Sequence, residues 1–257
     1  MPLISPQYLN DIESEVAQLE SGDSFQWSTV ASTDVGRVRP RNEDAFFYNE
    51  EQWLWVVADG MGGHSRGETA SKTVIDDLRS FTQLESLTEN VKDLETRFLL
   101  SNNTCRTMFR HETMGSTVVT FLAFDRSGVF LWVGDSRIYR LRQGKLEQMT
   151  EDHNLVQEKC RRGELTPEEA QQHPSANILT RAIGVHQNLR VEMEYAAIER
   201  GDRYLLCSDG LYRDLQSSEI QELLGSDEKQ EALDNLMSLA LDRGGKDNIT
   251  AMIVQAD

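Results

Sequence analysis

Cysteine is scarce in this sequence, and its positions argue against two kinds of site. The 257 residues contain three cysteines, Cys105, Cys160 and Cys207, and no two of them form a close pair. This spacing speaks against a disulfide framework and against a zinc site built from thiolates. It is typical of a protein from a reducing compartment, so we expect a cytoplasmic location.

Long apolar runs and an excess of basic residues are also missing. No run approaches the ~20 apolar residues of a membrane span, and the N-terminus lacks the basic start and apolar core of a secretory signal. The chain has 43 acidic against 26 basic residues, which gives a net charge of -17. Because such a surface repels nucleic acids and anionic membranes, we expect neither as a partner.

What the sequence does contain is a succession of strand-like and helix-like patterns, long enough to bury a substantial core. Apolar residues at helical spacing mark the stretches 70–81, 87–105 and 233–241. With the strand-like runs, they predict a single α+β domain with largely antiparallel sheets. The strand-like runs cover residues 27–33, 44–49, 53–58, 116–124, 129–133, 137–142, 145–149, 203–208 and 249–254.

The N-terminal residues stand apart from this pattern. Tyr8, Ile12, Val16 and Leu19 recur at spacings of four, four and three, which predicts a short amphipathic helix. That helix either packs on the body of the domain or serves as a regulatory, partner-binding arm. We therefore predict an N-terminal extension over residues 1–27, followed by one domain that runs to the C-terminus.

A polar segment at residues 151–185 interrupts the strands. It contains Pro167 and Pro174, and the letters TPEE at residues 166–169 read as an N-cap, a first helical proline and an N3 glutamate. We interpret the segment as a helical insertion within the domain.

Acidic residues recur where apolar runs end or begin. Asp59 follows WLWVVA, Asp135 follows FLWVG, and Asp209 follows YLLCS. One Asp-Gly pair is an ordinary turn. A carboxylate at the end of several strand-like runs, scattered along the sequence, instead suggests that these residues form one site. The same pattern places Asp247 before the last strand-like run, and Glu43 and Asp44 at the start of an early one.

If these strand ends converge, the carboxylates would repel one another unless cations lie between them. Ligands that are all oxygen favour hard metals such as magnesium, manganese or calcium. Glycine beside such a ligand, as in Asp59-Gly60, also lets a backbone carbonyl approach an ion closely.

A series of ordered motifs then points to a family. In chain order they are RVRPRNEDAFF, VVADGMGGHSRGE, GSTVV, VGDSRIYRLRQGKL, TEDHNLV, LTRAIG, LLCSDGL and KDNIT. The chain resembles metal-dependent serine/threonine protein phosphatases of the protein phosphatase 2C type, most closely the bacterial branch. The resemblance runs from about Ser28 to the C-terminus and leaves the N-terminal extension uncovered.

The resemblance implies a fold and a cofactor. The fold would be a β-sandwich of two antiparallel sheets flanked by α-helices, in four α-β-β-α layers. A site for two ions, Mn²⁺ or Mg²⁺, would lie at one end of the sandwich, and residues 151–185 would form a mobile flap beside the substrate cleft.

Matched motif by motif, the resemblance also implies ligands. Asp59 would bridge both ions, Asp209 and Asp247 would hold one of them, and the carbonyl of Gly60 would help to hold the other. The remaining matches are Glu43 and Asp44, an acidic pair that acts partly through water, and Asp135 with Asp209, the ligands of a third ion in many bacterial members.

The expected reaction is hydrolysis of phosphoserine and phosphothreonine in proteins. Two divalent ions roughly 3.5–4 Å apart can lower the pKa of a shared water and clamp the attacking and leaving oxygens. Arg39, one of three alternating arginines, matches the family's phosphate-binding arginine. His64 is a candidate general acid; many animal members place a histidine where this chain has Met61, so a water remains the alternative.

Other functions stay open at the level of the sequence. A non-catalytic member could bind phosphopeptides or a kinase, a two-metal phosphoesterase could act on small phosphates, and a structural protein could bind calcium. No metal ligand of the family pattern is missing, and no compact calcium loop is present. We therefore expect an enzyme that acts on phosphorylated proteins, opposes a serine/threonine kinase and works as a monomer.

Overall fold

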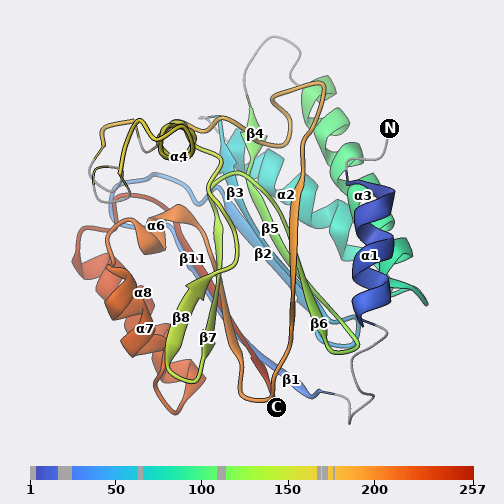
Figure 1. Cartoon of the computed structure of the whole chain (residues 1–257). Helices are drawn as coiled ribbons and strands as arrows, with labels where there is room; N and C mark the ends of the chain where they lie inside the picture. Colours follow the sequence, from blue (N-terminus) through green and yellow to red (C-terminus); the bar gives the residue numbers. More distant parts are fainter. Residues whose placement is uncertain are drawn as a thin grey trace.

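The computed structural model describes residues 4–16, 25–62, 66–108, 114–166, 169, 173–175 and 177–257. Two antiparallel sheets face each other, and helices cover their outer faces (Figure 1). The arrangement confirms the predicted α+β sandwich in four layers. The predicted residues Leu19, Pro167 and Glu168 lie outside the described ranges.

The two sheets are built almost entirely from the strands that the sequence predicted. One sheet has the order β1 (Trp27–Asp34), β11 (Ile249–Ala256), β10 (Arg203–Cys207), β7 (Arg137–Arg142), β8 (Lys145–Gln148). The other has the order β2 (Asp44–Asn49), β3 (Leu54–Met61), β5 (Val118–Phe124), β6 (Ser127–Val133), β9 (Glu192–Ala197), and β4 (Gly115–Ser116) pairs with the end of β3.

Strand β9, at the edge of its sheet, was missed because its sequence, EMEYAA, offers only two large apolar side chains, Met193 and Tyr195, and so only a short alternation. Gln143 and Gly144 form a hairpin turn between β7 and β8. Both residues have positive φ angles, 49° and 74°, as a two-residue turn between β7 and β8 requires.

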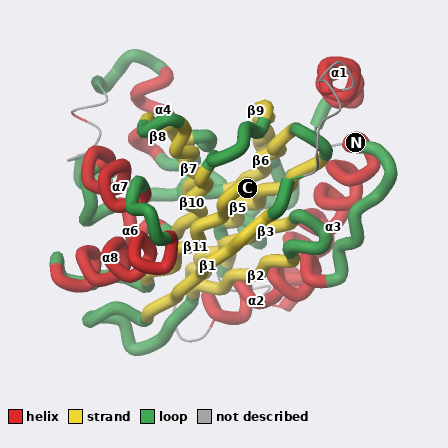
Figure 2. The backbone as a smooth tube through the Cα atoms, turned by 90° about the horizontal axis from the view of Figure 1, so that it is seen from below, coloured by secondary structure: helices red, strands yellow, loops and turns green. Residues whose placement is uncertain are grey.

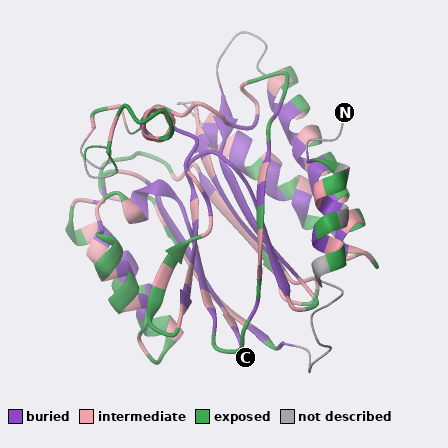
Figure 3. Cartoon of the chain, in the orientation of Figure 1, coloured by how far each residue is buried: buried purple, intermediate pink, exposed green. Residues whose placement is uncertain are grey.

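The helices divide between the two outer faces. Helices α2 (Arg66–Arg79) and α3 (Leu87–Met108) lie with the β2–β9 sheet, and α7 (Ser217–Leu224) and α8 (Lys229–Asp242) lie with the other. Short helices α4 (Leu155–Arg161) and α6 (Asp209–Tyr212) lie near one end of the sandwich. Figure 3 shows buried residues along the central strands and exposed residues on the outward faces of these helices.

The strand β3 explains why WLWVV reads as core. Its side chains alternate between two apolar clusters, with Leu54 and Val56 packed toward the helices and Trp55 and Val57 packed between the sheets. Because both faces of the sheet are covered, the strand is apolar throughout rather than every second residue. This burial holds the strand rigid up to Asp59, at the end nearest α4 and α6.

The N-terminal helix α1 (Pro6–Val16) packs on the body of the domain. Leu9 and Ile12 are each 1% exposed and join the cluster between α2, α3 and the sheet. Thr88 of α3 donates a hydrogen bond of 2.7 Å to Glu13. Figure 2 shows α1 on the side of the sandwich opposite α7 and α8. The sequence left open whether this helix packs on the domain or extends as an arm, and in the structure it packs on the domain.

Candidate metal centre and active site

The acidic residues predicted from strand ends come together at one end of the sandwich. Asp44 and Asp59 are register partners in the β2–β3 pair. Asp44 reaches the other sheet, since its Oδ2 accepts hydrogen bonds of 2.7 Å from Ser208 and from Thr250. These bonds join the two sheets at the point where the acids gather.

Asp44 is a buried carboxylate with half of its hydrogen-bonding capacity unused. It is 8% exposed, and its Oδ1 is buried without a partner. Burial raises the pKa of Asp44 to about 7, although the hydrogen bonds from Ser208 and Thr250 lower it. An unpaired buried oxygen of this kind is costly unless a cation or a donor meets it.

Asp59 lies at the centre of the carboxylates that gather here. We call Asp59 and its neighbours Asp44, Asp135, Asp209 and Asp247 the acidic group. Burial raises its pKa well above the ordinary value, and the charges of Asp44, Asp209, Asp135 and Asp247 raise it further. Its backbone is held in place by Thr117, whose hydroxyl accepts from the Asp59 N–H at 3.1 Å and whose N–H donates to the Asp59 carbonyl at 2.8 Å. The side chain is therefore fixed among like charges.

Gly60 is required by a close approach of two backbones. A Cβ at this position would lie 2.1 Å from the carbonyl oxygen of Gly67, at the start of α2, and 2.6 Å from that of Glu43. The Gly60 N–H donates to the same Glu43 carbonyl at 3.1 Å. The glycine that the sequence suggested for an ion thus also allows α2 to pack against the end of β3.

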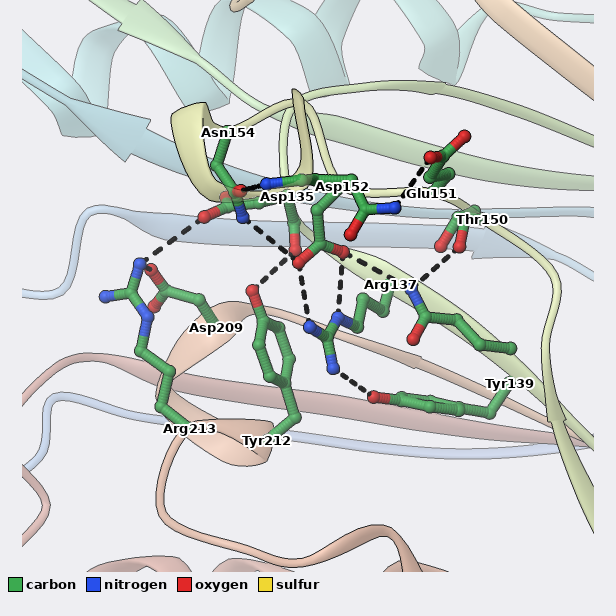
Figure 4. Close-up of polar contacts among 12 residues, drawn as sticks. Asp135, Arg137, Tyr139, Thr150, Glu151, Asp152, Asn154, Asp209, Tyr212 and Arg213 are labelled. Carbon is green, nitrogen blue, oxygen red and sulfur yellow. Dashed lines mark hydrogen bonds and ion pairs between the residues drawn. The ribbon is translucent and has the colours of Figure 1, made fainter. Parts of the chain in front are cut away.

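Asp135 and Asp209 share one arginine. Arg213 Nη2 lies 3.3 Å from Asp135 Oδ2 and 2.6 Å from Asp209 Oδ2 (Figure 4). Burial raises the pKa of Asp135 to about 8 and that of Asp209 to about 6, and Arg213 lowers both. The other Asp209 oxygen, Oδ1, is buried without a partner.

Asp247 and Arg39 form the outer edge of the group. Arg39 Nη2 lies 2.7 Å from Asp247 Oδ2, and the arginine side chain is 52% exposed. The neighbouring Asn248 fixes the loop that carries Arg39, because it donates to the carbonyls of Val35 and Arg41 and accepts from the N–H of Glu43. An exposed guanidinium is thus held beside the buried acids.

The group is not a preassembled metal cluster. Within the described ranges, no three histidine, cysteine or acidic side chains are arranged to hold an ion as they stand. Instead, Arg39 forms an ion pair with Asp247. Arg213 forms ion pairs with Asp135 and Asp209. His64, the predicted general acid, lies outside the described residues.

Comparison with known proteins agrees with this geometry. The family model for protein phosphatase 2C matches residues 37–252. This chain belongs to the protein phosphatase 2C family. It is 35% identical over 240 residues to the serine/threonine phosphatase stp of Listeria monocytogenes, a match that covers 88% of this chain and 94% of that protein.

Solved structures of similar proteins share the fold. PppA, described as a key regulatory component of T6SS in Pseudomonas aeruginosa, is 39% identical with a TM-score of 0.83, over 90% of this chain and 98% of that one. The catalytic domain of the serine/threonine protein phosphatase PstP, in complex with two manganese ions, is 32% identical with a TM-score of 0.81, over 91% and 99% of the two chains.

The segment 151–185 of this phosphatase 2C chain is anchored to the acidic group through Asp152. Asp152 receives two hydrogen bonds from Arg137, at 2.8 and 2.7 Å. The guanidinium of Arg137 lies over the ring of Tyr212, 3.6 Å from its centroid, and the Tyr212 hydroxyl donates to the Asp135 carbonyl at 2.8 Å (Figure 4). A continuous set of contacts therefore runs from the insertion to Asp135.

His153, beside this anchor, is buried. It is 3% exposed, and its Nδ1 accepts from the N–H of Gly134 at 3.1 Å.

The described part of segment 151–185 also shows the predicted cap. Thr166 and Glu169 exchange hydrogen bonds of 2.9 and 3.3 Å.

Every described helix is too short or too polar to span a bilayer.

The sequence analysis missed several residues that position the acids. Ser208, Thr250 and Asn248 lie within the motifs LLCSDGL and KDNIT, but the motifs do not reveal their contacts, because their partners lie more than 160 positions away. Arg213 had a weak local signal, since it follows Asp209 by four residues and can share its helical face.

Proposed function

We propose that this chain is a metal-dependent protein phosphatase that hydrolyses phosphoserine and phosphothreonine in proteins. The observation that carries the proposal is the convergence of buried carboxylates whose pKa values are raised by burial and by one another. Such a group is unfavourable in an isolated fold and becomes favourable when divalent cations neutralise it.

The residues fit hard divalent ions such as Mn²⁺ or Mg²⁺. The donors are all oxygens, and two of them, Asp44 Oδ1 and Asp209 Oδ1, are buried without any partner. The residues that would hold two ions are Asp59 between them, Asp209 and Asp247 on one, and the Gly60 carbonyl on the other, with Glu43 and Asp44 supporting through water. When bound, such ions lower the pKa of a water and neutralise the phosphoryl group.

Arg39 would bind the phosphoryl group of the substrate. Its guanidinium is half exposed, and among the described residues its contact with Asp247 engages only Nη2 of its N–H donors. A planar guanidinium can grip two phosphate oxygens at once, which orients the phosphorus for attack. His64 remains the proposed proton donor to the leaving alkoxide.

The partners follow from the same reaction. Phosphorylated proteins are the substrates, and a serine/threonine kinase is the enzyme that supplies them.

The location, oligomeric state and domain limits are part of the same proposal. We place the reaction in the cytoplasm, since Cys105, Cys160 and Cys207 are free thiols, and we expect a monomer. We also propose that residues 1–27 are an extension of a domain over 28–257, with the flap at 151–185.

The first test is hydrolysis of p-nitrophenyl phosphate and of a phosphothreonine peptide, titrated with MnCl₂. We expect turnover that depends on Mn²⁺, stops with EDTA and is lost in Asp209→Asn. Asp242→Asn is the matched control, because Asp242 is an exposed aspartate whose ion pair with Arg37 lies on the surface. Wild-type activity in Asp209→Asn, or Mn²⁺ binding without any turnover, would contradict the proposal.

A further inference from the structure

The resemblance matched Asp135 and Asp209 to the ligands of a third ion. We propose instead that Arg213 is a built-in cation at this position, so that the chain binds two divalent ions and not three. This inference rests on the proposed function, because it concerns how the same acidic site is neutralised.

The geometry places one charge between two acids. Arg213 Nη2 lies 2.6 Å from Asp209 Oδ2 and 3.3 Å from Asp135 Oδ2, so a single nitrogen contacts both carboxylates (Figure 4). A third ion held by Asp135 and Asp209 would have to compete for these oxygens. The guanidinium is always charged at neutral pH, so its occupation of the position does not depend on metal supply.

The arginine is held in place from several directions. Its side chain is 27% exposed, against 3% for Asp135 and 10% for Asp209. Its backbone N–H donates to the Asp209 carbonyl at 3.0 Å, which closes the turn that brings the two side chains together. The preceding residue, Tyr212, donates to the Asp135 carbonyl at 2.8 Å and lies under Arg137. Displacing Arg213 would therefore disturb a packed segment.

The two Asp209 oxygens divide their roles. Oδ2 is bound to Arg213, whereas Oδ1 is buried and has no partner. Asp209 can thus keep its arginine and still offer one oxygen to an ion on its other side. Asp135 also contacts the guanidinium through its Oδ2, at 3.3 Å, so the same arginine nitrogen lies between the two carboxylates that a third ion would need.

The inference is tested by counting bound Mn²⁺, not by measuring turnover. Free Mn²⁺ is followed by electron paramagnetic resonance while the purified full chain is titrated, and the number of sites is fitted. We expect two ions in the wild type and three in Arg213→Gln and Arg213→Ala. Arg243→Gln is the matched control, since Arg243 forms an ion pair with Glu219 away from the acidic group, and should keep two.

Asp135 supplies a test that does not require a new site to form. In the wild-type background, Asp135→Asn should still bind two ions, and combined with Arg213→Gln it should return the count from three to two. Far-ultraviolet circular dichroism checks that each variant is folded.

The outcomes separate the two proposals. Three ions in the wild type, a loss of one ion in Asp135→Asn alone, or two ions in folded Arg213→Gln would each overturn the role of Arg213 and leave the phosphatase assignment standing. A wild-type chain that binds no Mn²⁺ would overturn the metal-dependent function itself.

Discussion

Asp44 and Asp59 lie directly opposite each other in the register of β2 and β3. Like charges at facing positions of a sheet are destabilising, and here one of the pair is 8% exposed. Ser208 and Thr250 stabilise Asp44 from the other sheet, but Asp59 receives no comparable support from side chains in the described structure. The facing carboxylates therefore destabilise the metal-free fold, and bound cations would offset that cost.

Asp59→Asn should separate stability from activity. Asparagine removes the cost of burying an ionisable carboxyl here and its repulsion with Asp44, so in EDTA we expect the melting temperature to rise by roughly 3–6 °C, corresponding to about 1–2 kcal/mol. Phosphatase activity with Mn²⁺ should fall on the order of 100-fold or more. Differential scanning calorimetry and p-nitrophenyl phosphate hydrolysis measure the two effects. A lower melting temperature in EDTA would show that Asp59 stabilises the metal-free fold.

Arg39→Ala should weaken substrate binding more than turnover. Loss of a charge-assisted contact to phosphate predicts a KM for a phosphothreonine peptide that rises roughly 10-fold, with a smaller change in kcat. Arg37→Ala is the control, since Arg37 lies in the same loop but donates to the Leu241 carbonyl of α8 at 2.9 Å. Equal effects of the two substitutions would argue that Arg39 acts only through the loop.

His153 should make the protein sensitive to acid. Burial lowers the pKa of His153 to about 4, and the nearby Arg181 lowers it further than Glu192 raises it. Above pH 6.5 the ring is neutral in both states and has no effect. Between pH 6.5 and 4 only the unfolded chain takes up the proton, so stability is lost as the pH falls.

The comparison of wild type with His153→Gln isolates this effect. From pH 7.5 to pH 5, the free energy of unfolding of the wild type should drop relative to the variant by about 2 kcal/mol. Urea denaturation at both pH values, with EDTA throughout, gives the difference. A difference that stays constant with pH would show that His153 titrates in the folded protein as it does in the unfolded chain.

Leu9→Ala should destabilise the domain and leave catalysis intact. Leu9 is 1% exposed in the cluster that α1 shares with α3, so the substitution leaves a cavity that costs ~2–4 kcal/mol. Gln7→Ala, on the exposed side of the same helix, should cost much less. Thermal unfolding measures the loss, and kcat at 20 °C should stay within twofold of wild type. A large fall in kcat would instead support a regulatory role for the extension.

Much of the site could be predicted because its acids follow strongly apolar strands. Asp59 and Asp209 each end a run of core residues at a glycine, a local pattern that a linear sequence displays. The edge strand β9 escaped prediction, since Met193 and Tyr195 are its only large apolar side chains and give too short an alternation. The partners of the acids escaped for another reason: Ser208 and Thr250 meet Asp44 only because two sheets pack together.

The sequence by itself determined most strands and helices and the carboxylates at the strand ends, because periodic burial and turn chemistry are local properties of a chain; the two-sheet sandwich was implied by the family resemblance. Only the tertiary structure decided how those carboxylates are neutralised. It brought Arg39 to Asp247 and Arg213 between Asp135 and Asp209. Charge interactions act through space between segments that are distant in sequence, so their pairing becomes visible only after the sheets and helices have packed.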